Sequence, residues 1–307
     1  MHLIFIQILI LPIQLNRMYD ICCIGHITSD KLVNSQSVMF MPGGTAYYFS
    51  CALSGFGVSY LLVTALADSD MSYVDDLRGK GVEVKVQPSG HTVCFENIYA
   101  ENQDERSQRV TQKADAFTME QLTAVDAKIF HLGPLLADDI PVDLIWELSQ
   151  KGNISLDVQG YLREVIESEV YVAGWPEKME ALQYVSILKA DVAELKALTD
   201  CITVEDGVKL VSGLGVKEVI ITDGSAGSII YSDGIFHAIP AYHPKTITDA
   251  TGCGDTYMAG YLYERNKGTG IQQAGEFAAA MAGLKTAAAG AFMGTEEDVA
   301  RFWESFY

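Results

Sequence analysis

Basic residues are scarce in this sequence. Among 307 residues there are 21 lysines and arginines but 40 aspartates and glutamates, so the formal net charge is −19. Proteins that hold DNA, RNA or an anionic membrane surface neutralise phosphates with clustered lysine and arginine. The sequence therefore predicts no nucleic-acid partner and no membrane partner. A single bound nucleotide remains compatible with this charge, because backbone amides and a metal ion can neutralise a few phosphates locally.

Cysteines are also few, and they form no C-x-x-C pair and no disulfide framework. Most lie in apolar stretches, where cysteine acts as a small apolar residue, so we expect a reducing, cytoplasmic compartment. The histidines are scattered and no H-E-x-x-H motif is present. A cysteine–histidine metal cluster and histidine-based catalysis are therefore not favoured.

Long apolar runs are missing after the N-terminal segment MHLIFIQILILPIQL. That segment is near the length of a signal-peptide core but short for a membrane span. It lacks a basic leader and a small-residue cleavage site, and Met18 opens the strand-like run that follows. We expect residues 1–17 to be a start-site extension or a loose tail; an export signal or anchor is the alternative.

Short β-rich runs alternate with amphipathic stretches along the chain, as in YDICCIGH (19–26), SYLLVTALA (59–67) and the helical pattern at 71–81. The runs are apolar on both faces, which is typical of parallel strands covered by helices. Two regions, 29–44 and 82–110, instead show period-two alternation and turn residues with no helix between. The sequence thus predicts an α/β fold with a mostly parallel central sheet, and a small separate sheet as a lid.

The stretch TITDATGCGDTYMAGYLYERNKG (246–268) carries the strongest chemical signal. Gly252-Cys253-Gly254 is predicted to turn into a helix that continues to Lys267. Glycines allow positive φ, and the amides and dipole of a helix N-terminus attract an anion. Asp255 would be either a helix cap or a proton acceptor beside that anion, an arrangement that suits phosphoryl transfer. A capped turn without a ligand is the alternative.

Two common nucleotide signatures are absent. The sequence has no G-x-x-x-x-G-K-[ST] motif and no G-x-G-x-x-G after its first strand. A nucleotide-dependent oxidoreductase is therefore not favoured.

The run from Asp249 to Asp255 resembles the D-T-T-G-A-G-D signature of the ribokinase-like (PfkB) family of carbohydrate and nucleoside kinases, with Ala250 and Cys253 as departures. The likeness extends from about Met18 to the C-terminus. It implies a three-layer α/β/α sandwich over 18–307 with a β-sheet lid, and an ATP-dependent kinase acting on a hydroxyl of a small sugar, polyol or nucleoside. ATP and Mg²⁺ would be cofactors, and a monovalent cation is left open. Asp255 would be the catalytic base, with the amides of Gly252, Cys253 and Gly254 as the anion hole.

Further landmarks carry the same resemblance. MPGG (41–44) is similar to the family's N-terminal glycine pair, which implies that Gly43 and Gly44 approach the acceptor substrate. Asp30 lies where the family binds substrate hydroxyls, and a carboxylate can accept two such hydrogen bonds; a solvated loop aspartate is the alternative. Asp249 is implied on the acceptor side as well. Asp157 and Arg163, at the end of another strand, are further candidates.

The nucleotide side shows a second group of matches. KADVAELKALT (189–199) resembles an N-x-x-E element near the phosphates, so Asp191 would contact ATP and organise Mg²⁺ together with Glu194, through water. Both residues also suit an ordinary helix start. ITDGSAGSIIY resembles a T-x-G-x-x-G turn, and the small-residue segment 279–292 resembles the adenine side. These matches imply ATP contacts from Thr222, Gly224, Gly227 and Gly290.

Tyr48 stands where sugar kinases of the family commonly carry asparagine. A phenol is larger than an amide and cannot offer its paired donor and acceptor, so ribose is not favoured. An inositol-like ring or a nucleoside is predicted instead, with Phe40, Tyr47, Phe95 and Tyr99 as a lining unless they only pack the lid. A catalytically inactive ATP-binding regulatory protein remains the alternative. Lid strands can pair between subunits, which would give a homodimer.

Overall fold

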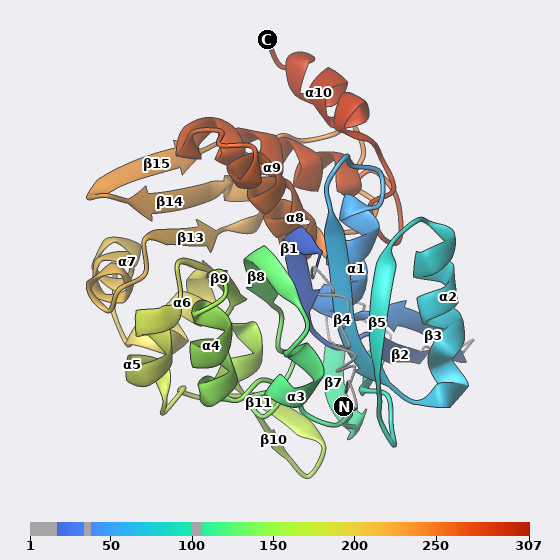
Figure 1. Ribbon diagram of the computed structural model, residues 1–307. Coiled ribbons are helices and arrows are strands. Elements are labelled where there is room, and N and C mark those ends of the chain that lie inside the picture. The colour runs from blue at the N-terminus through green and yellow to red at the C-terminus, as the bar shows by residue number, and fades with distance from the viewer. Residues whose placement is uncertain (1–16, 34–37, 100–105) are drawn as a thin grey trace, which may run out of the picture.

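The protein is described here by a computed structural model (Figure 1) that covers residues 17–33, 38–99 and 106–307. Of the predicted extension, only Arg17 is among the described residues, and its guanidinium pairs with Glu83 at 2.9 Å. The remainder of that extension, and parts of the two predicted lid regions, lie outside the described residues: 1–16, 34–37 and 100–105.

The large sheet of the described chain has nine strands, in the spatial order β15-β14-β13-β12-β9-β8-β1-β4-β5. The seven strands from β13 to β5 run parallel, and β14 and β15 add antiparallel pairs at one edge. In chain order the strands are β1 (Met18–Ile24), β4 (Tyr60–Leu66), β5 (Glu83–Pro88), β8 (Asp126–Leu132), β9 (Asn153–Asp157), β12 (Ile187–Asp191), β13 (Glu218–Thr222), β14 (Ser228–Ser232) and β15 (Ile235–Ile239). The predicted mostly parallel sheet is confirmed.

Both faces of this sheet are covered, because its strands are apolar on both sides. In β1, Ile21 and Cys23 pack into one core, and Cys22 and Ile24 pack into the other. The first core is closed by α1 (Gly44–Leu53), α2 (Met71–Gly79), α8 (Cys253–Asn266) and α9 (Ile271–Lys285). The second is closed by α3 (Met119–Leu122), α4 (Val142–Ser149), α5 (Lys178–Ala181), α6 (Val192–Thr199) and α7 (Val204–Gly213). The predicted three-layer sandwich is therefore present, and α10 (Glu296–Glu304) packs against α9 near the C-terminus.

A second sheet of six strands is the predicted small sheet, in the order β10-β11-β7-β6-β2-β3. Its strands are β2 (Thr28–Val33), β3 (Val38–Gly43), β6 (Cys94–Tyr99), β7 (Arg106–Gln112), β10 (Arg163–Ile166) and β11 (Glu169–Val172). Two points differ from the prediction. β5, within the predicted lid region 82–110, belongs to the large sheet, because it pairs in parallel with β4 from Leu61 onward. The hairpin of β10 and β11 extends the small sheet and was not predicted there.

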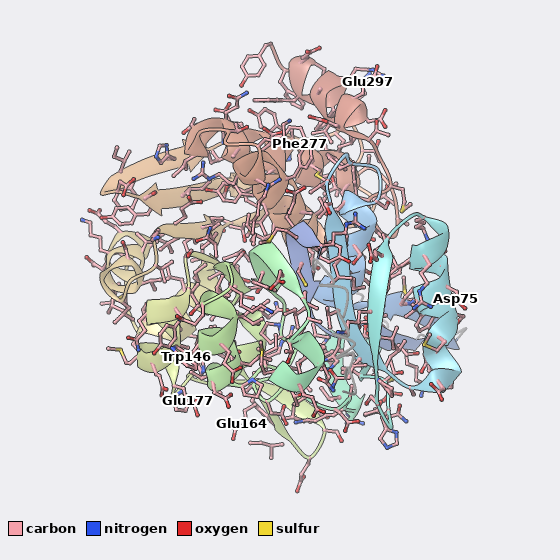
Figure 2. All side chains as sticks on the ribbon, in the orientation of Figure 1. Asp75, Trp146, Glu164, Glu177, Phe277 and Glu297 are labelled. Atoms are coloured by element: carbon pink, nitrogen blue, oxygen red, sulfur yellow. The ribbon has the colours of Figure 1, made fainter. Side chains whose placement is uncertain are left out.

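Several acidic residues lie on the surface. Asp75, Glu164, Glu177 and Glu297 are exposed and project from the outside of the molecule, whereas Phe277, on α9, is buried (Figure 2). In the described part of the chain, none of the helices is both long and apolar enough to cross a membrane.

Candidate active site

The glycine turn lies at the start of α8, as predicted. Gly252 has φ of +73° and precedes the first helical residue, Cys253. A side chain at position 252 would be strained by this φ, and its Cβ would come within 2.4 Å of the Tyr48 ring. The amides of Gly254 and Asp255 fall in the first helical turn, where no acceptor exists within the helix. The turn thus presents N–H groups at the positive end of a 14-residue helix.

Asp255 lies in a charged, mostly enclosed environment at this turn. Burial, and then the nearby carboxylate of Asp157, raise the pKa of Asp255 to about 6, although Lys189 and a hydrogen bond from Thr45 act in the opposite direction. A carboxylate with such a pKa is ionised at neutral pH, yet it binds a proton far more readily than an ordinary aspartate. This is the behaviour required of a general base.

Lys189 is a candidate site residue that the sequence reasoning missed. It lies on β12, is only 6% exposed, and its Nζ is 3.1 Å from Asp157 Oδ2 and 3.7 Å from Glu194 Oε2. Although burial disfavours its charge, Asp157, Glu194 and Asp255 raise the pKa of Lys189 above its ordinary value. A Cβ on Gly254 would be 3.3 Å from its Nζ, so the ammonium lies directly beside the anion-binding turn. A lone charged residue in the apolar strand ILKAD was the available signal.

Tyr48, one of the predicted acceptor-side residues, lies near Asp30, Asp249 and Asp255. Tyr48, on α1, is 5% exposed, and burial, followed by the carboxylates of Asp30, Asp249 and Asp255, raises the pKa of its phenol. Asp30 lies across from Gly43, where a Cβ would come within 2.5 Å of its Oδ2. Gly44 starts α1 with φ of +82°. Gly43 and Gly44 thus connect β3 of the small sheet to the helix that carries Tyr48 and Thr45.

Asp157 and Arg163 lie in different parts of the structure although they are close in sequence. Asp157 ends β9 and pairs with Lys189, its register partner on β12. Arg163 begins β10, where its guanidinium lies 5.6 Å from the centre of the Phe95 ring and donates to the Leu135 carbonyl. Asp157 thus belongs to the charged cluster beneath the turn, whereas Arg163 belongs to the small sheet.

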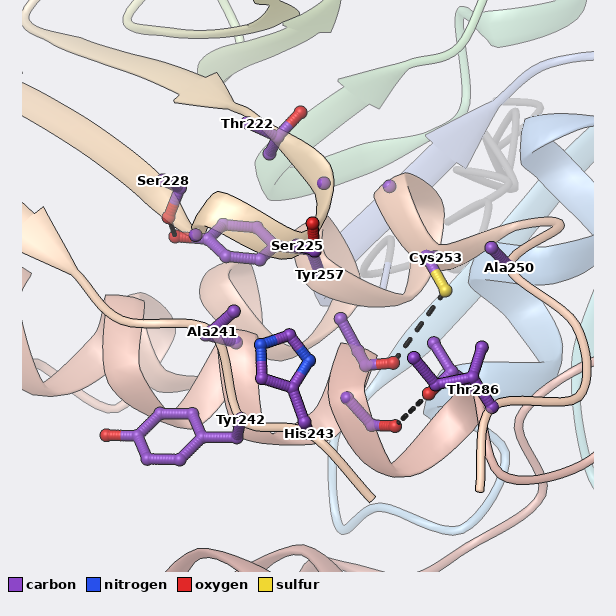
Figure 3. Close-up of a pocket in the computed structure, with 17 residues that line it drawn as sticks. Thr222, Ser225, Ser228, Ala241, Tyr242, His243, Ala250, Cys253, Tyr257 and Thr286 are labelled. Atoms are coloured by element: carbon purple, nitrogen blue, oxygen red, sulfur yellow. Dashed lines mark hydrogen bonds between the residues drawn. The ribbon is translucent and has the colours of Figure 1, made fainter. Parts of the chain in front are cut away.

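A pocket of about 270 Å³ opens beside the turn, between the β13–β14 connection, α8 and α9 (Figure 3). Thr222, Gly224 and Gly227 line it, as predicted for the nucleotide side, and so do Cys253 and Gly254. Both glycines of the T-x-G-x-x-G turn have positive φ, at +49° and +101°. The other walls are mainly apolar or aromatic, and they include Ala241, Tyr242, His243, Ile247, Tyr257, Ala279 and Ala282. Asp191 and Gly290 do not line this pocket.

Asp191 and Glu194 form a helix cap. Glu194 N donates to Asp191 Oδ1 and Asp191 N donates to Glu194 Oε2, each at 2.7 Å, so the two residues close a capping box at the start of α6. Gln159 Nε2 also donates to Glu194 Oε1 at 2.9 Å. No group of three or more histidine, cysteine or acidic side chains in the described residues is placed to hold a metal ion. The predicted contact of these carboxylates with Mg²⁺ through water therefore stays a prediction.

Asp249 and Gly290 are brought together in a structural role that the sequence did not predict. Asp249 Oδ1 accepts from Thr251 N, and Oδ2 accepts from Gly290 N at 3.1 Å and from Lys285 Nζ at 3.1 Å. Burial alone would raise the pKa of Asp249, but these hydrogen bonds hold it below the usual value. The carboxylate thus joins the loop before the glycine turn to the loop after α9. Its predicted contact with the acceptor stays a prediction.

Cys253 packs rather than reacts. Its Sγ donates to the Ala282 carbonyl at 3.7 Å, and burial raises the pKa of the thiol to about 11. A thiol with this pKa remains protonated at neutral pH, so the side chain acts as a small filler between α8 and α9. Its backbone N–H donates to the Ala250 carbonyl at 3.2 Å, so its predicted place in the anion hole stays a prediction.

Comparisons with known proteins agree with this geometry. The profile of the pfkB family carbohydrate kinases matches residues 9–297. The cytidine kinase of Thermococcus kodakarensis is 27% identical over 269 residues, which cover 83% of this chain and 92% of the relative. A pyrophosphate-dependent kinase in the ribokinase family, solved with a pyrophosphate analog and myo-inositol, has a TM-score of 0.82 at 28% identity and covers 92% of this chain and 99% of that chain. The ribokinase of Arabidopsis thaliana, solved with ribose and ATP, shares the fold at a TM-score of 0.77 and 20% identity, covering 94% of this chain and 99% of that chain. The chain therefore belongs to the pfkB family of carbohydrate kinases and is a sugar or nucleoside kinase with the ribokinase fold.

Proposed function

We propose that this kinase transfers the γ-phosphoryl group of ATP to a hydroxyl of a nucleoside or a cyclic polyol, with Asp255 as the base. The observation that carries the proposal is the position of Asp255. It lies in the first turn of α8 directly after Gly254, which lines the apolar pocket, and its charge acts on Tyr48, which Asp30 also faces. A donor phosphate and an acceptor hydroxyl could therefore meet at this single carboxylate.

Asp255 would accept the proton of the attacking hydroxyl. Its pKa of about 6 keeps it ionised at neutral pH while preserving enough basicity to take the proton. Thr45, which donates a hydrogen bond to the carboxylate, would fix its orientation. General bases of this kind contribute about 10² to 10⁴-fold in rate.

The developing negative charge on the phosphoryl oxygens would be held by this chain's own groups. The amides of Gly254 and Asp255 supply hydrogen bonds at the helix start, and Lys189 supplies a full positive charge beside them. Because Lys189 is already held by Asp157 and Glu194, it needs no reorganisation when the phosphoryl group arrives. Bound Mg²⁺ would neutralise the donor phosphates, with Glu194 and Asp191 holding its water ligands.

For the donor, the pocket favours a nucleotide. Pyrophosphate carries no apolar group, yet this cavity has mostly apolar walls, and Ile247 at its edge is 60% exposed. The His243 ring projects from the 240–247 segment toward the same space (Figure 3). A purine base would cover these surfaces. Pyrophosphate is the second candidate, because a relative of 28% identity is a pyrophosphate-dependent kinase.

For the acceptor, Tyr48 and the small sheet favour a ring larger than ribose alone. The buried phenol of Tyr48 narrows the site next to Asp255, and the small sheet contributes Asp30 beside it. The cytidine kinase and the myo-inositol complex among the similar proteins support the two acceptor classes. The small sheet would also exclude water, which otherwise competes for the phosphoryl group.

The test is a matrix of donors and acceptors. ATP, GTP and pyrophosphate would each be combined with nucleosides, inositols and ribose, with product phosphate esters measured directly by mass spectrometry. We expect ATP with a nucleoside or an inositol to give the highest kcat/KM. Preference for pyrophosphate would overturn the donor assignment, and ribose as the best substrate would overturn the acceptor assignment. Absence of transfer in every combination would favour the inactive ATP-binding alternative.

A further inference from the structure

Lys285 is a buried ammonium that the mechanism above does not use. It is the last residue of α9, and its side chain is 0% exposed. Its Nζ donates to the backbone carbonyl of Asp249 at 2.8 Å and to Asp249 Oδ2 at 3.1 Å. Lysine is rarely buried to this extent unless its charge is paired, and here the pairing partner belongs to the loop that leads into the glycine turn.

The two loops joined by this ion pair are tied at several further points. Thr248 N donates to the Thr286 carbonyl at 2.7 Å, and Thr248 Oγ1 donates to the Ala287 carbonyl at 3.0 Å. Gly290 N donates to Asp249 Oδ2, on the same carboxylate that Lys285 holds. The segment 248–251, which immediately precedes Gly252, is thus held against the segment 285–290, and within the described residues Lys285 forms the ion pair with Asp249.

We propose that the ammonium of Lys285 takes the structural place of a bound monovalent cation, so that this kinase fixes its anion-binding turn without one. A cation placed between these loops would need a carbonyl oxygen and a carboxylate as ligands. The oxygens of Asp249 that would supply them already accept hydrogen bonds from Lys285. A second positive charge at the same oxygens would be repelled by the ammonium. The monovalent cation left open by the family resemblance therefore does not fit here.

In this role Lys285 is a positioning residue. By holding Asp249, it fixes the position of the backbone that leads into Gly252. It thereby fixes the position of the amides that would face the phosphoryl group. Its charge also acts on Cys253, the first residue of α8. There it partly offsets the rise in the thiol pKa that burial causes. A misplacement of reacting groups by about 1 Å can cost about 100-fold in rate.

The first test uses the unmodified protein. Melting temperature and kcat would be measured in KCl, NaCl and choline chloride at matched ionic strength. We expect both to be the same in all three salts, because no site selects K⁺. A melting temperature or kcat that rises selectively with K⁺ would overturn the proposal. The kcat readout depends on the kinase assignment, but the melting temperature does not, so failure of one proposal can be told from failure of the other.

The second test replaces the lysine. Lys285→Met should lower kcat by about 10 to 100-fold with a smaller change in KM. Lys285→Ala leaves room for a cation, so K⁺ should raise its melting temperature and kcat although it affects neither in the unmodified protein. Lys209→Met, which removes an exposed ion pair with Glu205, is the matched control and should respond to no salt. An undiminished kcat in Lys285→Met would contradict the proposal. So would a folded Lys285→Ala whose melting temperature and kcat do not respond to K⁺. If both variants fail to fold, the salt comparison on the unmodified protein still decides.

Discussion

The two sides of the candidate site are built in different ways. The donor side is a pocket bounded by the β13–β14 connection, α8 and α9, all parts of the main sandwich, and glycines with positive φ shape it. The proposed acceptor side joins α1 to a separate six-stranded sheet, and it is formed by side chains such as Tyr48 and Asp30. In the proposed assignment, backbone geometry therefore shapes the donor side, whereas side chains shape the acceptor side.

This difference explains why one half of the function is easier to infer. Backbone geometry requires glycine at fixed spacings, so a donor site leaves a pattern in the sequence. Acceptor recognition depends on how side chains from distant elements converge, and no spacing rule constrains it. The following predictions test whether the two sides can be separated, beginning with the residue that they share.

Asp255→Asn should have the largest effect, a loss of about 10² to 10⁴-fold in kcat with any acceptor, because the base is shared by both sides. The fold should remain intact or gain stability. Asp255 has a raised pKa in the native state, so its ionised form is disfavoured by folding at neutral pH, and an amide removes that cost. Steady-state kinetics would measure the loss of kcat, and thermal melting would measure the change in stability. A variant with near-normal kcat would contradict the role of Asp255.

The next test compares the pH dependence of kcat/KM in the unmodified protein and in Lys189→Met. Because Asp255 must be ionised, kcat/KM should fall as pH decreases through about 6. Lys189→Met should lower kcat by about 10² to 10³-fold and move this acid limb to higher pH, because Lys189 lowers the pKa of Asp255. It should also cost about 3–5 kcal/mol of stability by leaving Asp157 and Glu194 without their buried partner.

Lys189 would have only a structural role if the acid limb of the Lys189→Met profile stayed in place while stability fell. The pH profile separates the two roles, because a purely structural defect lowers the amount of folded enzyme without moving the pKa of Asp255. Assays below the measured melting temperature of the variant would keep this comparison valid.

Ala282→Leu should affect the donor side alone. The added side chain would enter the apolar pocket and raise KM for ATP by about 10-fold, while KM for the acceptor stays unchanged. Ala124→Leu, at an exposed position outside the lining, is the matched control. If pyrophosphate is the true donor, Ala282→Leu should leave its KM unaffected, so this variant also discriminates between donors.

Tyr48→Phe should give the smallest effect, on the acceptor side. Removal of the buried phenol oxygen between three carboxylates should change KM for the acceptor by about 3 to 10-fold, with KM for ATP constant. Kinetics with both substrates varied would measure this separation. An equal change in both KM values would show that the two sides are not independent at this residue.

Most of the fold could be predicted from sequence, because strands with apolar residues on both faces and amphipathic helices leave clear periodic signals. The turn at Gly252 was predicted from its glycines beside a helical run, and the ATP contacts of Thr222, Gly224 and Gly227 were predicted only from the resemblance to the family's T-x-G-x-x-G turn. The sheet to which β5 belongs was not predicted, because its alternating pattern suits an edge strand of either sheet.

Other residues depended on contacts far apart in sequence. Lys189 and Lys285 are single lysines, and only their burial against Asp157 and Asp249 distinguishes them from surface lysines. Thr45 is an ordinary helix residue until the fold brings it to Asp255. The family resemblance predicted that Gly290 contacts ATP. In the structure its backbone N–H donates to the Asp249 carboxylate, and sequence spacing did not indicate this bond. Spacing along the chain carries no information about such pairings.

The contact between Tyr48 and Gly252 has an evolutionary consequence. Because the ring rests where a Cβ of Gly252 would be, the residue that narrows the acceptor site also supports the catalytic turn. Natural variation at position 48 would alter turnover together with substrate preference, so new specificities within this lineage should arise through replacements in the small sheet, which can change without disturbing the turn.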